Sequence, residues 1–352
     1  MDIYSLINSL PKAEVHTHLE ISLTIDRVYE IANRNGIILP LSHEDCLYKS
    51  SHFNDLPDFL SVLLTVSQAL KFEQDFYELA LSYFKISHEN NIVYAEPQYH
   101  CFNYTTYGIQ PETILNGIWR AVQEAETTYG IKTNLLYGIA REATIEDSLK
   151  TIHFAKHHSE KFKGIAFAGS EMINSPKHYK PIFDLAYNLG LTGPNNEYLA
   201  VHSGEEAPPD VMIDTLRTLN VSRIDHGVRA VEDPFLLKFL SQNQVPIDMC
   251  PISNRALKVL DRFTNTDYIY NDFLNSGCLI SINTDGPTWG GGAMVENYID
   301  FCNHNTGLSS EELAKKIIEL SKNSFKCTFL DQKIKNDYIN QVEKAANDYF
   351  EI

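Results

Sequence analysis

Short apolar segments alternate with longer amphipathic segments along the chain, and this alternation limits the possible folds more than any other feature of the sequence. Several of the short segments are nearly continuous apolar runs, which is typical of strands buried on both faces of a parallel sheet. Helical patterns such as those of residues 181–189 and 234–242 lie between them. Eight such units in succession predict an α/β protein with a TIM-type (β/α)8 barrel. The eight predicted strands are residues 14–18, 92–96, 134–139, 164–168, 198–202, 223–226, 245–249 and 279–283.

The chain shows no internal feature that would divide it into domains. Its 352 residues exceed the length of an average domain, but barrels of this class reach that length as one unit. No Gly/Ser-rich or Pro-rich linker, repeat or low-complexity tract interrupts the sequence. We therefore expect residues 1–352 to form a single barrel domain.

Cysteine usage and charge indicate a cytoplasmic protein that handles a small molecule. The six cysteines lie far apart without a C-x-x-C spacing, so we expect reduced thiols and no disulfides. Residues 1–10 lack the pattern of a secretory signal, and the longest apolar runs, such as residues 59–64, are too short to span a membrane. The formal charge of −17 would repel duplex nucleic acid and an anionic membrane surface. The oligomeric state stays open.

The longest connection between predicted strands follows the first one. Residues 21–91 contain three predicted helices, at 26–35, 56–70 and 73–90, and Gly36 ends the first of them. An insertion at this point would cover the C-terminal mouth of the barrel, where active sites of this fold lie. We expect it to form a helical cap. Near the other end of the chain, Ser309 and Glu312 form a capping box that predicts a helix over residues 311–323.

Three histidines and one aspartate occur at predicted strand ends. His16 and His18 form an H-x-H pair that strand alternation places on the same face, and His202 and Asp285 end the fifth and eighth predicted strands. In isolation, His202 and Asp285 would be a core pair or a helix cap. Together, the four form a His3Asp set that leaves one position open, as a catalytic zinc site requires.

Acid–base candidates lie beside this set. Glu205 follows His202 by one tight turn and could hold a proton for a ring nitrogen, and its neighbour Glu206 competes for that role. His226 ends the sixth predicted strand and could take a proton from a zinc-bound water or orient the resulting hydroxide. Alternation along the same strand predicts that Asp225 points toward the helices, with Arg223 or Arg229 as its partner.

Missing residues narrow the class of zinc enzyme. Cytidine-deaminase-type sites need P-C-x-x-C, and no second cysteine follows Cys250 at that spacing. A barrel with two metal ions would need a bridging residue at the end of the fourth strand, whereas Lys163 lies at the start of that strand. The sequence therefore favours one metal ion per chain.

Five motifs of the chain resemble the adenosine/adenine deaminase family in order and spacing, from Pro11 to about Phe301. They are P-K-A-E-V-H-T-H-L-E, H-S-G-E-E-A-P-P, R-I-D-H-G-V, C-P-I-S-N and S-I-N-T-D-G-P. The resemblance implies that His16, His18, His202 and Asp285 bind one Zn2+, that Glu205 protonates the ring nitrogen of an aminopurine-like substrate, and that His226 is the partner of the zinc water. It also implies substrate contacts for Glu20, which matches a residue that contacts the sugar of nucleosides, and for the backbone N–H of Gly169.

Two segments of the sequence resemble the bacterial adenine-deaminase branch of the family. They are residues 205–209, and the glycines of residues 290–292 followed by Asn297. Two positions depart from the family pattern. Ile21 replaces a glycine, and Gly286 replaces an aspartate that contacts the imidazole side of the purine. We expect the space at Gly286 to admit a larger substrate or the indole of Trp289, and plain adenine and adenosine to be poor substrates.

The sequence thus predicts a zinc-dependent hydrolase that deaminates an aminopurine-like base or nucleoside and releases ammonia. Two alternatives stay open at this point. The chain could be a mononuclear amidohydrolase that acts on another aminated heterocycle, or a member that binds a nucleobase without turnover.

Overall fold

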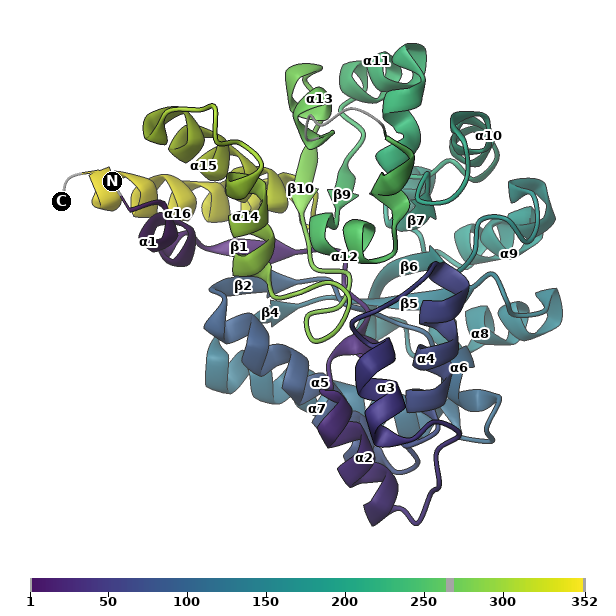
Figure 1. Cartoon of the computed structure of the whole chain (residues 1–352). Coiled ribbons are helices and arrows are strands. Elements are labelled where there is room, and N and C mark those ends of the chain that lie inside the picture. The colour runs from purple at the N-terminus through teal and green to yellow at the C-terminus, as the bar shows by residue number, and fades with distance from the viewer. Residues whose placement is uncertain (1, 264–268, 351–352) are drawn as a thin grey trace.

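Parallel strands at the centre of the molecule are surrounded by helices in the computed structural model, which describes residues 2–263 and 269–350 (Figure 1). The strand segments are β1 (Lys12–Glu14), β2 (Ile92–Ala95), β3 (Gln98–Tyr99), β4 (Lys132–Thr133), β5 (Leu135–Ala140), β6 (Phe162–Ala168), β7 (Leu199–Ser203), β8 (Arg223–His226), β9 (Ile247–Met249) and β10 (Ile280–Ile282). They form two hydrogen-bonded groups, β1-β2-β4 and β10-β9-β8-β7-β6-β5-β3, in which every pairing is parallel.

The two groups join into one closed barrel. β2 and β3 are two parts of one strand interrupted at residues 96–97, and β4 and β5 are interrupted only at Asn134. Residues beyond β1 close the ring, because Thr17 pairs with Asp285 and His18 pairs with Gln98. The described segments therefore make the eight-stranded parallel barrel that the sequence predicts, and each predicted strand overlaps an observed one.

Helices cover the outside of the barrel, and Figure 1 shows α8 to α11 following one another around it. The helices are α1 (Ile3–Ser9), α2 (Ile25–Arg34), α3 (His43–Lys49), α4 (Leu56–Ser67), α5 (Glu73–Glu89), α6 (Phe102–Thr105), α7 (Pro111–Tyr129), α8 (Ile145–His157), α9 (Pro176–Asn188), α10 (Pro209–Leu219), α11 (Pro234–Gln242), α12 (Pro251–Ala256), α13 (Tyr270–Asn275), α14 (Met294–Asn303), α15 (Ser310–Lys326) and α16 (Gln332–Phe350). The capping box predicted at Ser309 and Glu312 is present at the start of α15.

Part of the insertion between β1 and β2 forms the predicted cap, whereas the third predicted helix of the insertion, α5, packs against α7 on the outside of the barrel. Helices α2, α3 and α4 lie together at one end of the barrel, and the N-cap side chains of Thr24, Ser42 and Asp55 begin them. The cap is attached to the loop after β10, because Trp289 packs against Phe59 with ring centroids 5.4 Å apart and donates a hydrogen bond of 3.1 Å to the carbonyl of Leu23.

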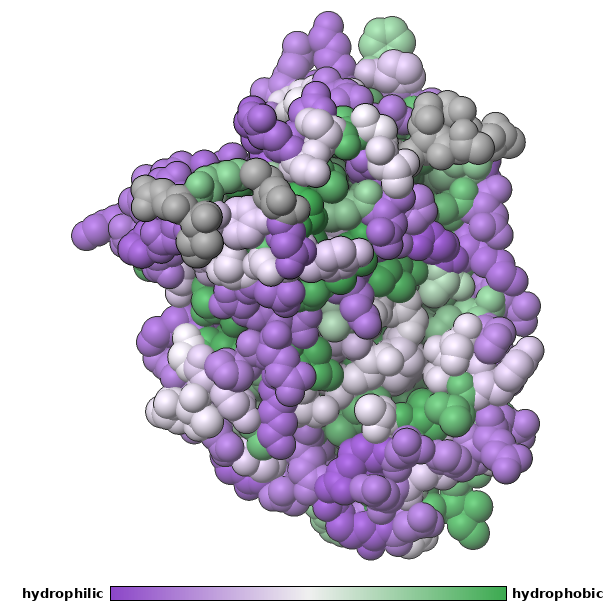
Figure 2. Space-filling view, turned by 60° about the vertical axis from the view of Figure 1, so that its left-hand side comes forward, coloured by the Kyte–Doolittle hydropathy of each residue, from purple (hydrophilic) through white to green (hydrophobic). Residues whose placement is uncertain are grey.

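The outer surface is polar at its rim. Figure 2 shows one face, on which hydrophilic and hydrophobic residues are mixed and hydrophilic ones prevail along the outline. Among the described residues, no helix combines the length and the apolar character that crossing a membrane would need.

Candidate metal centre and active site

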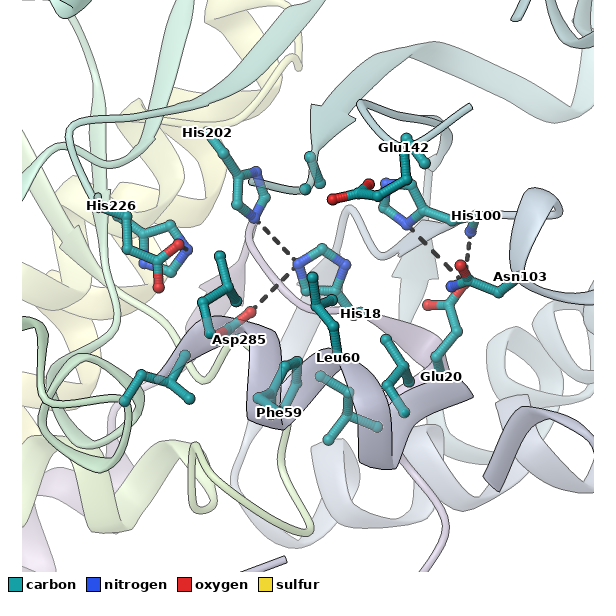
Figure 3. A pocket seen from close by; sticks show the side chains of 18 residues that line it. His18, Glu20, Phe59, Leu60, His100, Asn103, Glu142, His202, His226 and Asp285 are labelled. Atoms are coloured by element: carbon teal, nitrogen blue, oxygen red, sulfur yellow. Dashed lines mark hydrogen bonds and ion pairs between the residues drawn. The ribbon is translucent and has the colours of Figure 1, made fainter. Parts of the chain in front are cut away.

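Four side chains from three strand ends converge at the mouth of the barrel. His16 and His18 follow β1, His202 lies in β7, and Asp285 follows β10. One ligand atom from each lies within 4.8 Å of the others. The Nε2 atom of His18 is 3.2 Å from Nε2 of His202 and 3.2 Å from Oδ1 of Asp285, and Figure 3 shows His18 between these two residues (Figure 3).

The chemistry of this cluster fits a metal ion. Nε2 of His16 is buried without a hydrogen-bond partner among the described residues, and two imidazole nitrogens that face each other can share only one proton. Burial lowers the pKa of His202 well below its usual value, which favours the neutral ring and leaves one nitrogen lone pair available. Three imidazoles with one carboxylate are a donor set that suits Zn2+.

A second layer of polar groups orients these side chains. Oδ2 of Asp225 lies 3.2 Å from Nδ1 of His202 and accepts a hydrogen bond of 2.8 Å from Gln98. Ser253 donates a hydrogen bond of 2.5 Å to Oδ2 of Asp285. Burial would raise the pKa of Asp225, but the nearby His16, His202 and Arg223 hold it below its usual value. Such carboxylate–histidine pairs fix the ring orientation of a metal ligand.

The position of Asp225 corrects a prediction. Strand alternation placed this side chain toward the helices, whereas it points into the barrel below the histidines. The prediction was wrong because His226 has a φ of 66°, which breaks the alternation. As a result, the side chains of Asp225 and His226 both point inward. Arg229, one of the two partners suggested for Asp225, instead pairs with Glu232.

Glu205 and His226 face each other at the edge of the cluster. Oε2 of Glu205 is 3.5 Å from Nε2 of His226. Burial raises the pKa of Glu205 well above its usual value, and the negative charges of Asp285 and Glu171 raise it further, which favours the protonated form of this carboxyl. Burial lowers the pKa of His226 to about 4, which leaves the ring neutral.

Asn254 fixes the protonation of that neutral ring. Its amide nitrogen donates to Nδ1 of His226 at 3.0 Å, while its carbonyl oxygen accepts from Tyr270 at 3.3 Å. The proton of the imidazole then lies on Nε2, the nitrogen that faces Glu205. Sequence reasoning missed this residue, although it belongs to one of the five motifs.

Glu171 holds the loop that carries Glu205. Its carboxylate accepts hydrogen bonds from the backbone N–H groups of Gly204, Glu205 and Glu206, at 2.7, 2.8 and 3.0 Å. The side chain of Glu206 accepts a hydrogen bond from Ser170 at 2.8 Å and does not line the pocket. Of the two acids that the sequence leaves open, the structure therefore places Glu205 at the cluster.

The pocket in front of the cluster has an apolar side and a polar side. The cap helix α4 contributes Leu56, Phe59, Leu60 and Leu63 to the apolar side. The polar side consists of Glu20, His100, Asn103 and Glu142.

Two of the polar residues, Glu20 and His100, form a buried pair. Oε1 of Glu20 accepts a hydrogen bond of 2.5 Å from the backbone N–H of His100, while Oε2 of Glu20 and Nε2 of His100 have no partner among the described residues. Burial raises the pKa of Glu20, although the charge of His18 acts in the opposite direction. These atoms can accept or donate to a bound molecule. His100, Asn103 and Glu142 were not foreseen, and their positions shortly after β3 and β5 are the only signal that the sequence carries for them.

The two residues that depart from the family pattern meet in the structure. Gly169 lines the pocket, as expected of a substrate contact, but Gly286 does not, because the side chain of Ile21 covers it. The expectation of free space at Gly286 was therefore wrong. Trp289 does not enter that space either, since it is held by Phe59 and the carbonyl of Leu23.

Comparisons with known proteins agree with this geometry. The family model described as adenosine deaminase matches residues 11–345. The adenine deaminase of Acinetobacter baylyi is 33% identical over 344 residues, which cover 98% of this chain and 100% of that protein. The adenine deaminase of Streptomyces coelicolor is 32% identical over 97% of each chain. The crystal structure of adenine deaminase from Arthrobacter aurescens superposes with a TM-score of 0.86 at 28% identity and covers 95% of this chain and 98% of that one.

Proposed function

Because this chain belongs to the adenosine deaminase family, we propose that it hydrolyses the exocyclic amino group of an aminopurine-like base or nucleoside and releases ammonia. It is a hydrolase that acts on the C–N bond of a cyclic amidine. The observation that carries the proposal is the cluster of His16, His18, His202 and Asp285 beside the buried Glu205, whose pKa burial raises.

We assign one Zn2+ per chain to that cluster. The support is the donor set itself, together with the unpartnered Nε2 of His16 and the absence of a lysine at the end of β6, where Lys163 instead lies at the start and packs over Tyr198. When bound, a zinc ion lowers the pKa of a water molecule and thereby supplies the nucleophile.

Side chains of the protein would carry out the other parts of the proposed reaction. Glu205 donates its proton to the ring nitrogen next to the amino-bearing carbon, which makes that carbon more electrophilic. His226, neutral and protonated on Nε2, donates a hydrogen bond to the attacking oxygen. The backbone of Gly169 and the unpartnered atoms of Glu20 and His100 bind the rest of the substrate.

The relatives named above favour a free base as the substrate. The partner that the pocket accommodates is a small molecule, and no membrane or nucleic-acid partner belongs to the proposal. The six free cysteines support a cytoplasmic enzyme.

Ammonia release tests the proposal. Purified protein with added Zn2+ is assayed against adenine, adenosine, other aminopurines and aminated pterins. Glu205→Gln should keep its zinc and lose activity by ~10²-fold or more, because an amide cannot deliver the proton. Glu206→Gln, one residue away and turned toward Ser170, is the matched control and should stay close to wild type.

Each other outcome has a clear meaning. Release from the pterins alone would identify a hydrolase of another heterocycle. Binding of a base without release of ammonia would identify a member without turnover. Full activity in Glu205→Gln would show that another group is the acid.

A further inference from the structure

Ile21 and Gly286 compete for the same volume next to the metal cluster. Ile21 ends the short 3-10 helix of residues Leu19–Ile21, is 2% exposed and lines the pocket. A Cβ at position 286 would lie 2.6 Å from the Cβ of Ile21 and 2.9 Å from its Cδ1. The backbone of Gly286 is outside the left-handed region. The volume taken by Ile21 therefore restricts position 286 to glycine, whereas the backbone conformation at this position does not.

Three polar side chains of the described loop after β10 already have hydrogen-bond partners within the protein. In the loop after β10, Oδ2 of Asp285 accepts from Ser253, Thr288 donates to the carbonyl of Ile21 at 2.8 Å, and Trp289 donates to the carbonyl of Leu23. The hydroxyl and the indole N–H are thus used to hold the backbone of residues 21–23. At this edge of the pocket, a ligand would contact the aliphatic side chain of Ile21.

The position of this wall relative to the bound ring follows from the proposed function, on which this inference depends. Glu205 follows β7 and Gly286 follows β10, with β8 and β9 between them. If the amino-bearing carbon lies at the metal cluster and its neighbouring nitrogen lies at Glu205, the other side of that carbon faces the wall. In an aminopurine, that side carries N7 of the imidazole ring.

We propose that the Ile21–Gly286 contact makes this site select aminated heterocycles that present a C–H group at that edge, in place of a nitrogen that accepts a hydrogen bond. An acceptor pressed against the aliphatic side chain of Ile21 would lose its water and gain no hydrogen bond from that side chain, which costs about ten-fold or more in affinity. A C–H edge has no such requirement and packs against the aliphatic side chain. The substrate class is an aminated 7-deazapurine.

A matched pair of ligands tests this selection without dependence on catalysis. Hypoxanthine and 7-deazahypoxanthine are the products of the corresponding aminopurines and differ at the single ring position in question. Calorimetric titration of the zinc-loaded wild type should give a dissociation constant for 7-deazahypoxanthine about ten-fold or more below that for hypoxanthine. Equal dissociation constants, or a preference for hypoxanthine, overturn the inference.

Two substitutions test its structural cause. Gly286→Asp alone should lower the melting temperature, because its Cβ meets Ile21, and Ile21→Gly combined with Gly286→Asp should recover it. The double variant should shift the ratio of the two dissociation constants toward hypoxanthine by about ten-fold, since the carboxyl supplies a partner for the nitrogen. An unchanged ratio in a folded double variant contradicts the inference.

The two hypotheses fail in different ways. Ammonia released from aminopurines by a wild type that prefers the N7-containing ligand rejects the inference and leaves the proposed function standing. A wild type that neither binds the ligand pair nor releases ammonia from aminopurines rejects both.

Discussion

The carboxylate of Glu171, in the loop after β6, accepts a hydrogen bond of 2.8 Å from the backbone N–H of Glu205, in the loop after β7. Two further N–H groups on either side bind the same carboxylate. A side chain from one barrel loop thus determines the backbone position of the proposed acid in the next. Charge-assisted hydrogen bonds of this kind are about twice as strong as neutral ones.

Glu171→Gln should therefore displace Glu205 without touching the metal cluster. The amide presents an N–H group where the loop needs an acceptor, so we expect kcat to fall ~10-fold or more while the zinc content stays at the wild-type level. Steady-state kinetics and metal analysis check this. Glu197→Gln, at an exposed position, is the control. Unchanged kcat in Glu171→Gln would show that the loop holds its position without this carboxylate.

Removal of one ligand should remove the metal. His202→Ala takes away a nitrogen that lies 3.2 Å from Nε2 of His18, and we expect the zinc content to fall from about one ion per chain to well below half. His153→Ala on the outer face of α8 should keep the wild-type content. Elemental analysis after gel filtration measures both. Two ions per wild-type chain, or full occupancy in His202→Ala, would contradict the assignment.

The cap should contribute to substrate binding through its apolar face. Leu60 on α4 lines the pocket, whereas Leu64, one turn later, is 40% exposed. Leu60→Ala should raise KM several-fold, because apolar contact area with the substrate is lost, and Leu64→Ala should leave KM unchanged. Equal KM values for the two variants would mean that α4 does not contact the substrate.

Lys12 at the start of β1 should make stability depend on pH. Burial lowers the pKa of this amine to about 7, and its Nζ donates to the carbonyl of Leu10 at 2.8 Å. Between this pKa and the ordinary value of 10.5, the unfolded chain holds a proton that the folded chain lacks, so stability rises with pH in that window.

Lys12→Met should abolish that rise, which amounts to at most ~1.4 kcal/mol per pH unit. The free energy of unfolding in urea, measured at pH 7.5 and pH 9 for both proteins, tests the difference. The titrations of cysteine and tyrosine residues occur in both the wild type and Lys12→Met, so they cancel in the difference between the two pH profiles. Parallel pH profiles would show that Lys12 is not the source.

Local patterns predicted the fold well where strands and helices are regular. The predicted strand 223–226 and helix 234–242 coincide with β8 and α11. The first strand is different, because its ladder covers only Lys12–Glu14. Beyond it, the N–H groups of Val15 and His16 bind the side chain of Asn283 instead of a neighbouring strand. No periodic pattern of the sequence reports such a side-chain contact.

The candidate site likewise contains residues that the sequence pattern revealed and residues that it did not. Histidines and acids at strand ends could be found because parallel strands bring their carboxyl ends together. Asn254, Glu171 and His100 act through contacts with residues far away in the chain, which spacing does not reveal. Asp225 was misplaced because the left-handed backbone at His226 breaks the alternation on which the prediction depended.

The shared volume at positions 21 and 286 also makes the two positions depend on each other. With isoleucine at 21, a Cβ at 286 would lie 2.6 Å from the Cβ of Ile21, so a side chain at 286 requires either a shift of this wall or a smaller residue at 21. Glycine at both positions would instead leave empty space beside the metal cluster. The effect of a replacement at either position is therefore set by the residue at the other.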